Sequence, residues 1–358
     1  MTLVVPAAVV RAAQQVADDI GRLGGVCVDA ADELAGRAAL RGFPSPGRIS
    51  AGGASRLIAG GDGWWALTLS RADDVAAVPA LLEVDAVPDD PWPALLDAAA
   101  TRPAAELVAR ARLLGLPAAR LGEAEPAPPT VTRCGDQHPV QLPDLLVVDL
   151  SAMWAGPLCG RILADAGATV VKVESPQRPD GTRADPDFDR WMNGGKVRYT
   201  VDLDDPALRE LLGAADVVIE SSRPGALSRR GLGPDDCRAR PGRVWLQLSG
   251  YGADHPDRVA FGDDAAVAGG LVGDGPVFCG DAIADPLSGL EAARCVLASL
   301  ADGGGTVIGL AMAAVAARYA ALSRDGWVTL PSRRPSLRWK PVRQAGFQQL
   351  TAGRAAPC

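Results

Sequence analysis

The chain has little with which to bind a metal or to form disulfides. Its 358 residues include only two histidines and seven cysteines, and no two cysteines form a CxxC pair. Zinc sites are built from histidines and closely spaced cysteines, so we expect no metal site. Scattered thiols are typical of proteins kept in a reducing compartment, and we therefore expect a cytoplasmic location.

Charge and hydropathy exclude two further classes of protein. The net charge is −7, and only three of the 36 basic residues are lysine. An acidic chain is poorly suited to broad nucleic-acid binding, so we expect no nucleic-acid partner. The sequence has no run of about 20 apolar residues, which predicts no membrane span. Its start also lacks the basic and apolar pattern of a secretion signal.

Three segments precede the main repeating pattern of the chain. Residues 1–56 are predicted to be helical, because apolar residues recur at helical spacing from 6 to 41, with a break at Gly24-Gly25. Residues 57–122 begin with a turn and a strand and continue with helical patterns, which predicts a small α+β domain. Residues 123–144 contain the run EAEPAPPT, whose prolines favour an extended linker.

Strand and helix patterns alternate from residue 145 to 325. Such alternation predicts a largely parallel sheet covered on both faces by helices. The predicted strands are Leu145–Leu150, Thr169–Val173, Asp216–Glu220 and Val244–Leu248. The predicted helices are Gly156–Ala166, Pro206–Ala214, Leu287–Leu300 and Met312–Leu322. Residues 326–358 are rich in Arg, Pro and Gln and are expected to form a C-terminal tail.

Polar residues follow these strands, at the edge where open α/β sheets bind ligands. The turn AGPLCGR (Ala155–Arg161) leads into a helix, whose free N–H groups suit an anion. Its spacing fits neither the dinucleotide fingerprint nor the P-loop. The turn ESSRPG precedes Arg229 and Arg230, and arginine binds phosphate with two parallel hydrogen bonds. Both patterns also occur in ordinary strand-to-helix connections.

Four aspartates are candidates for a catalytic role: Asp263, Asp264, Asp281 and Asp285. Asp285 precedes a proline and a helix, which is also the pattern of a helix N-cap. The segment SGYG (Ser249–Gly252) follows an apolar strand, and its glycines permit either a ligand contact or a tight turn. His138 and His255 lie beside prolines in polar loops, and we expect both at the surface.

Five motifs occur in a fixed order along this region. They are DLSxxxAGPxxGRxLADxGAxVxKVE, NxGK, ExxRPGxLxRxGL, SGYG and DPLSGLxAAxxxLASL. Because it carries these motifs in this order, the chain resembles the family III CoA-transferases, a group related to the α-methylacyl-CoA racemases. The resemblance implies a Rossmann-like, open parallel sheet over residues 145–325 with a smaller α+β domain. It also implies a homodimeric enzyme that transfers CoA from an acyl-CoA to a carboxylic acid, with CoA as co-substrate and no permanent cofactor.

The resemblance also assigns roles to residues. The family nucleophile falls on Asp285, with Asp281 as second choice. This carboxylate would attack the thioester and form an aspartyl anhydride, followed by an aspartyl–CoA thioester. The positions implied to contact CoA are Ser151, Ala155, Gly156, Glu174, Glu220, Ser221, Ser222, Arg229, Gly250, Tyr251 and Asp263.

The chain departs from the family pattern in three ways. Racemases have a histidine before the aspartate that Asp263 matches, where this chain has Gly262, which favours transfer over epimerisation. Ser175 and Ser221-Ser222 replace residues that the family often uses toward CoA. The small-domain segment precedes the catalytic segment instead of following its first part. Two alternatives therefore stay open, namely a racemase-type enzyme and a non-catalytic CoA-binding or scaffold protein.

Overall fold

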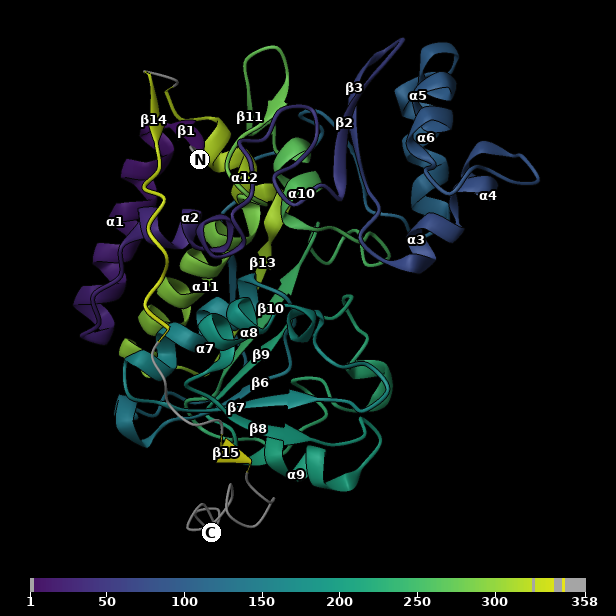
Figure 1. The fold of residues 1–358 in the computed structure, drawn as a ribbon. Coiled ribbons are helices and arrows are strands. Elements are labelled where there is room, and N and C mark those ends of the chain that lie inside the picture. The colour runs from purple at the N-terminus through teal and green to yellow at the C-terminus, as the bar shows by residue number, and fades with distance from the viewer. Residues whose placement is uncertain (1–2, 324–325, 338–342, 345–358) are drawn as a thin grey trace.

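The computed structural model describes residues 3–323, 326–337 and 343–344. Its largest element is an eight-stranded sheet in the order β15-β8-β7-β6-β9-β10-β13-β5 (Figure 1). The strands are β15 (Arg343–Gln344), β8 (Val197–Thr200), β7 (Thr169–Glu174), β6 (Leu146–Asp149), β9 (Val217–Glu220), β10 (Val244–Ser249), β13 (Thr306–Ala311) and β5 (Thr130–Arg133). All neighbours are parallel except β13 and β5. The predicted α/β class with an open, largely parallel sheet is confirmed.

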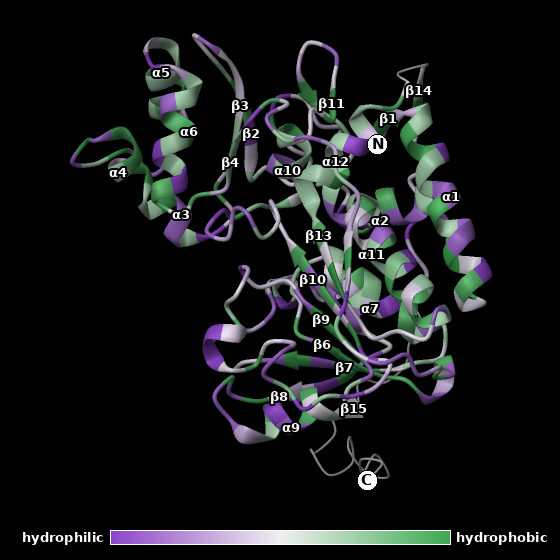
Figure 2. Cartoon of the chain, turned by 180° about the vertical axis from the view of Figure 1, so that it is seen from behind, coloured by the Kyte–Doolittle hydropathy of each residue, from purple (hydrophilic) through white to green (hydrophobic). Residues whose placement is uncertain are grey.

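Alternate residues of the central strands face two different hydrophobic clusters, as the period of a β-strand requires. Val147 of β6 packs in the cluster that contains helices α7 (Ala155–Asp165) and α11 (Ala284–Ala301). Its neighbours Leu146 and Val148 pack with helix α9 (Pro206–Ala214) instead. Both faces of these strands are therefore buried, and β9 and β10 are mostly hydrophobic along their length in Figure 2.

The first two helices pack into the core of the main sheet. Helix α1 (Ala7–Gly24) ends at Gly25, whose φ of 66° is one that glycine adopts without strain. Asp29 then caps α2 (Ala30–Arg41) by accepting the N–H of Asp32. The break predicted at Gly24-Gly25 is confirmed. Ile20 of α1 and Leu34 of α2 lie in the same cluster as α7 and α11.

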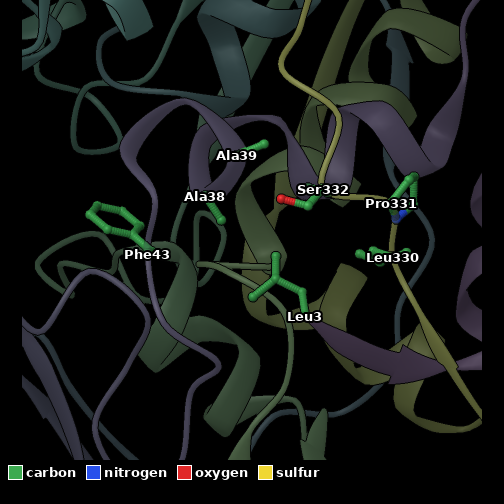
Figure 3. Close-up of a pocket in the computed structure, with 8 residues that line it drawn as sticks. Leu3, Ala38, Ala39, Phe43, Leu330, Pro331 and Ser332 are labelled. Carbon is green, nitrogen blue, oxygen red and sulfur yellow. The ribbon is translucent and has the colours of Figure 1, made fainter. Parts of the chain in front are cut away.

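Residues beyond 325 return to the N-terminal segment. Strand β14 (Trp327–Thr329) pairs antiparallel with β1 (Val4–Pro6). Leu330 then packs beside Leu3 and Phe43 around a small apolar pocket, to which α2 contributes three alanines (Figure 3). The described part of the expected tail is thus ordered against the fold, whereas residues 345–358 lie outside the described residues.

A second, antiparallel sheet of three strands lies to one side of the main sheet (Figure 1). It consists of β2 (Ser55–Gly60), β3 (Gly63–Thr68) and β4 (Ala118–Arg120). Its helices are α3 (Ala72–Ala76), α4 (Val78–Leu82), α5 (Trp92–Thr101) and α6 (Ala104–Leu113). The last three share a separate core with Trp65. From the same strands, Leu57 and Ala66 pack against Val267 of α10 (Gly262–Ala268). The hairpin β2–β3 therefore contacts the segment 145–325 directly.

Several elements were not predicted. The segment expected as a linker, 123–144, includes β5, which forms one edge of the main sheet. An edge strand with all four residues exposed has no apolar pattern to reveal it. Strand β8 carries Arg198 in its interior, and helix α10 has only seven residues. Helix α8 (Pro186–Asn193), which buries Phe188 and Trp191, was missed as well.

Candidate active site

Three aspartates and one arginine converge where α11 begins. Asp263 lies at the start of α10, while Asp281 and Asp285 lie on either side of the turn into α11. We call these three residues the aspartate cluster. Arg37 of α2 donates from Nε to Oδ2 of Asp281 over 2.9 Å, and one of its terminal nitrogens donates to Oδ1. Asp281 is fully buried, whereas Asp285 is partly exposed.

Asp285 is held by the backbone around it. It is the second residue of α11, and Ile283 is the residue that precedes the helix, so Asp285 is not an N-cap. Burial raises the pKa of Asp285 to about 7, while nearby Arg37 acts to lower it and Asp263 to raise it. A backbone hydrogen bond from Gly262 also favours the ionised form. A carboxyl that titrates near neutrality is typical of catalytic sites.

Position 262 has no room for a side chain. A Cβ added to Gly262 would lie 2.2 Å from the carbonyl oxygen of Ala282 and 2.5 Å from Oδ2 of Asp285. Ala282 itself has a φ of 42°, a conformation that costs energy for a residue with a Cβ. The backbone at this turn thus leaves no space for a histidine before Asp263, the position of the racemase base.

A chain of hydrogen bonds links the aspartate cluster to the hairpin β2–β3. Asp263 accepts from the hydroxyl of Ser55 over 3.0 Å and from the N–H of Ala282 over 3.1 Å. The hydroxyls of Ser55 and Thr68 lie 2.9 Å apart, and the Thr68 hydroxyl lies 3.0 Å from a carboxyl oxygen of Asp264. Asp263, expected to contact CoA, is placed beside Asp285 and fixes the strained turn.

Asp264 gives a prediction about stability. Burial raises its pKa to about 8, above its ordinary value of 3.8. The stability that this group contributes is therefore present below pH 4 and is lost as the pH rises through 8. In the wild type, the free energy of unfolding should therefore fall by about 1.4 kcal/mol per pH unit over this range. Asp264→Asn resembles the protonated acid in shape, and we expect this fall to be absent from the variant. Melting temperatures from pH 5 to 9 measure it, with the exposed Asp254→Asn as control. Parallel curves for Asp264→Asn and the wild type would refute the assignment.

The turn before α7 is fixed by buried lysines. Ser151 donates its hydroxyl and its N–H to Asp149, and a Cβ on Gly156 would lie 2.2 Å from that of Ser151. Lys196 lies 2.7 Å from Asp149 and also donates to the carbonyl of Pro157 over 2.8 Å. Lys172 donates to the carbonyl of Ser151. Two of the three lysines thus stabilise the turn that includes Ser151, Ala155 and Gly156.

Two of the carboxylates expected to contact CoA are engaged within the protein. Glu174 forms ion pairs of 2.6 Å with both Arg183 and Arg198. Glu220 accepts from Trp245 Nε1 over 3.0 Å and from Gln247 over 2.9 Å. Both carboxylates therefore have partners within the protein, and their contact with CoA stays a prediction.

The remaining residues expected to contact CoA differ in accessibility. Ser222 donates to Glu220 over 3.0 Å, and Ser221 accepts the N–H of Ala152 over 3.1 Å. Arg229 is exposed after β9. Two further residues lie after β10: Gly250 packs closely on Ala260, and the ring of Tyr251 is covered by Arg258 at 3.2 Å. The set is therefore divided among several strand ends, with Arg229 its most accessible charge.

The described residues contain no group of three or more His, Cys, Asp or Glu side chains arranged to hold a metal ion. Within that same part of the chain, no helix is both long enough and apolar enough to cross a membrane.

His138 and His255 are exposed, as expected. The small pocket of Figure 3 does not include any residue of the aspartate cluster.

Arg37, Ser55 and Thr68 were not predicted as site residues. Arg37 and Asp281 are 244 positions apart in the sequence, and Ser55 and Asp263 are 208 apart. Arg37 lies in an ordinary amphipathic helix, and Ser55 and Thr68 lie in a short hairpin. No local pattern distinguishes them, and only the folded arrangement brings them to the aspartates.

A parallel α/β sheet with a partly exposed aspartate at the first turn of a helix defines a candidate enzyme site. Residues 142–327, slightly more than half of the chain, match the model of CoA-transferase family III. The protein therefore belongs to the family III CoA-transferases.

Individual relatives match only parts of the chain. The chain is 34% identical over 151 residues to succinyl-CoA–D-citramalate CoA-transferase of Chloroflexus aurantiacus, covering 37% of each protein. It is 32% identical over 228 residues to succinate–glutarate CoA-transferase of Agrobacterium fabrum, covering 55% of this chain and 56% of that protein. It is also 36% identical over 116 residues to the α-methylacyl-CoA racemase of Homo sapiens, covering 31% and 28%.

Solved structures match over a similar extent. The crystal structure of Rv3272 from M. tuberculosis is 31% identical, with a TM-score of 0.44, and covers 52% of this chain and 55% of that one. The chain thus spans between 28% and 56% of the length of the relatives described.

Proposed function

We propose that the protein transfers CoA from an acyl-CoA donor to a carboxylic acid acceptor, with Asp285 as the nucleophile. The observation that carries this proposal is the environment of Asp285. Asp285 is a partly exposed residue whose carboxylate accepts a hydrogen bond from the N–H of Gly262 and is close enough to Arg37 to be stabilised by its charge. Asp281, the other candidate, is fully buried and fully engaged by Arg37.

The reaction begins with two exchanges at Asp285. A carboxylate oxygen attacks the thioester carbonyl carbon, the C–S bond breaks, and CoA leaves as thiolate. The thiolate then attacks the side-chain carbonyl of Asp285. The anhydride C–O bond breaks, the donor acid leaves as a carboxylate, and an aspartyl–CoA thioester remains. Covalent catalysis of this kind divides one exchange into several steps, each of which connects intermediates of similar free energy.

The acceptor acid reverses these steps. Its carboxylate attacks the aspartyl–CoA thioester and releases CoA thiolate, which forms a second anhydride. The thiolate attacks the acceptor's acyl carbon, and Asp285 is regenerated as a carboxylate. No proton is gained or lost overall, so the site needs no second base. The absence of space for a side chain at position 262 agrees with transfer and disfavours the racemase alternative.

CoA exchange tests this proposal. The protein is incubated with succinyl-CoA and a panel of isotopically labelled carboxylic acids, and new acyl-CoA thioesters are measured. We expect labelled acyl-CoA and parallel double-reciprocal plots, because a covalent enzyme intermediate separates the two half-reactions. The same assay is repeated with a panel of other acyl-CoA donors, and CoA binding without exchange from any of them would instead favour the non-catalytic scaffold.

Ligand binding gives a second prediction. Free CoA is expected to raise the melting temperature, because a ligand held only by the folded protein stabilises it by about 2.7 kcal/mol at 100 times its Kd. Arg229→Ala should weaken CoA binding about tenfold, since it removes a charged partner for phosphate. Arg230→Ala is the matched control, because the exposed Arg230 already pairs with Asp204 over 2.5 Å. An unchanged melting temperature at millimolar CoA would contradict the prediction.

We also propose a cytoplasmic homodimer with Rossmann-like CoA binding, as the family resemblance implies. In this arrangement residues 57–122 are the small domain, displaced to the front of the chain. The hydrogen bond between Thr68 of this segment and Asp264 of α10 supports this assignment, as does the adjacent Ser55, which donates to Asp263. These two hydrogen bonds bring the hairpin β2–β3 against α10, which carries Asp263 next to Asp285.

A further inference from the structure

Arg37 lies outside the segment that matches the family, yet its guanidinium pairs with Asp281 of the aspartate cluster. It is supplied by α2, far upstream of residues 142–327. Its side chain is 19% exposed, and its two hydrogen bonds hold both oxygens of Asp281. Such two-point pairing fixes orientation as well as charge.

Aromatic rings enclose the same guanidinium. Its carbon lies 4.8 Å from the ring centre of Trp154, 5.7 Å from Phe43 and 5.9 Å from Phe188. Trp154 directly precedes α7, at the turn where the family resemblance places CoA contacts. Stacking on Trp154 and pairing with Asp281 therefore connect the CoA-binding turn to the loop before α11 through one side chain.

Arg37 supplies positive charge to a site that otherwise contains the carboxylates of Asp263, Asp281 and Asp285. The groups that act on the carboxylate of Asp285 are Arg37 from α2, Asp263 from α10 and Asp281 from the preceding turn. Arg37 also acts to lower the pKa of Asp263. Among the described residues, Arg37 is the one cation that forms an ion pair with this cluster. Its removal would leave the three carboxylates unpaired there, and like charges close together favour protonation of one of them.

We propose that Arg37 is a positioning residue for the transfer reaction, which holds Asp281 in place and keeps Asp285 ionised when the thioester arrives. The inference rests on the proposed function, because only the ionised carboxylate attacks a thioester. Arg37 acts through Asp285 and Asp281 and touches no reacting atom. The charge it supplies comes from a segment that the family match does not include.

The pH dependence of acylation tests this role in the full-length protein. Single-turnover release of CoA from succinyl-CoA is measured from pH 5 to 9.5 in the wild type, Arg37→Lys and Arg37→Met. The wild-type rate should rise with pH and reach half its maximum near pH 7, the pKa of Asp285. Arg37→Met should move the midpoint upward by a unit or more, which lowers the rate about tenfold at pH 6 and restores it at alkaline pH. Arg37→Lys should retain most of the wild-type midpoint.

Two further variants separate charge from structure. Arg37→Met/Asp281→Asn removes both members of the buried pair, so it leaves no unpaired carboxylate at position 281. Its midpoint should still be higher than that of the wild type, because Arg37 acts on Asp285 more strongly than Asp281 does. Arg41→Met is the matched control on the same helix, and its midpoint should not change. Equal loss of rate at every pH in the Arg37 variants, with the midpoint unmoved, would overturn the proposal.

The titration of Asp285 can also be followed without turnover. Infrared difference spectra against Asp285→Asn report the carboxylate band of this residue in each variant. A shifted band midpoint in Arg37→Met, combined with a wild type that transfers no CoA, would retain the role of Arg37 and reject the proposed function. An unshifted band in an active enzyme would reject the role of Arg37 alone.

Discussion

Asp285→Ala is expected to lower CoA transfer by at least about 10⁴-fold, because loss of a covalent nucleophile leaves only binding and orientation. The protein should remain folded, since Asp285 is partly exposed and forms no ion pair among the described residues. Transfer is measured with succinyl-CoA and a labelled acceptor, and folding by thermal melting. Free CoA should still raise the melting temperature of the variant.

The variant Asp281→Asn is expected to affect stability more than activity, in contrast to Asp285→Ala. Asp281→Asn should destabilise the protein by about 3–5 kcal/mol, because it leaves the charge of Arg37 buried without its partner. Activity should fall less than in Asp285→Ala when both are assayed below the melting temperature. An inactive Asp281→Asn together with an active Asp285→Ala would show that the nucleophile is misassigned.

A chain that begins at Val131 is expected to be insoluble or inactive. It lacks α1 and α2, whose apolar residues, Ile20 and Leu34 among them, pack in the same cluster as α7 and α11. Exposing that apolar surface favours aggregation. It also lacks Arg37 and Ser55, which contact Asp281 and Asp263. Expression yield, light scattering and CoA transfer measure the outcome.

The control for this truncation is to supply the missing residues as a separate chain. Co-expression of residues 1–130 with the chain from Val131 should restore solubility and part of the activity, because it supplies the same contacts without the covalent connection. A truncated chain that is folded and fully active on its own would show that the N-terminal part is an independent appendage.

The parallel sheet could be predicted from the sequence because its central strands are buried on both faces. Runs such as Leu145–Leu150 and Asp216–Glu220 are nearly continuous in apolar residues, and the structure places β6 and β9 within them. The edge strands could not be predicted this way. β5 is exposed along its whole length, and β8 contains an arginine that pairs with Glu174 and Asp189.

The site could be predicted only in part. The family motif led to Asp285, whereas the local pattern alone favoured a helix cap, which the structure rules out because Asp285 lies within α11. Glu174 and Glu220 had the pattern of ligand contacts, and the sequence did not reveal that arginines, a tryptophan, an amide and a hydroxyl of the protein would also bind them. Arg37 became visible only when folding brought α2 against the turn before α11.

The most direct test of the central claim is peptide mass spectrometry of the protein after incubation with succinyl-CoA and hydroxylamine. Hydroxylamine attacks an activated aspartyl carbonyl and leaves a hydroxamate on the residue that formed the intermediate. We predict that the modification maps to Asp285, requires an acyl-CoA and is absent from Asp285→Ala. Modification at Asp281 or Asp263, or active CoA transfer with no modified aspartate, would contradict the account.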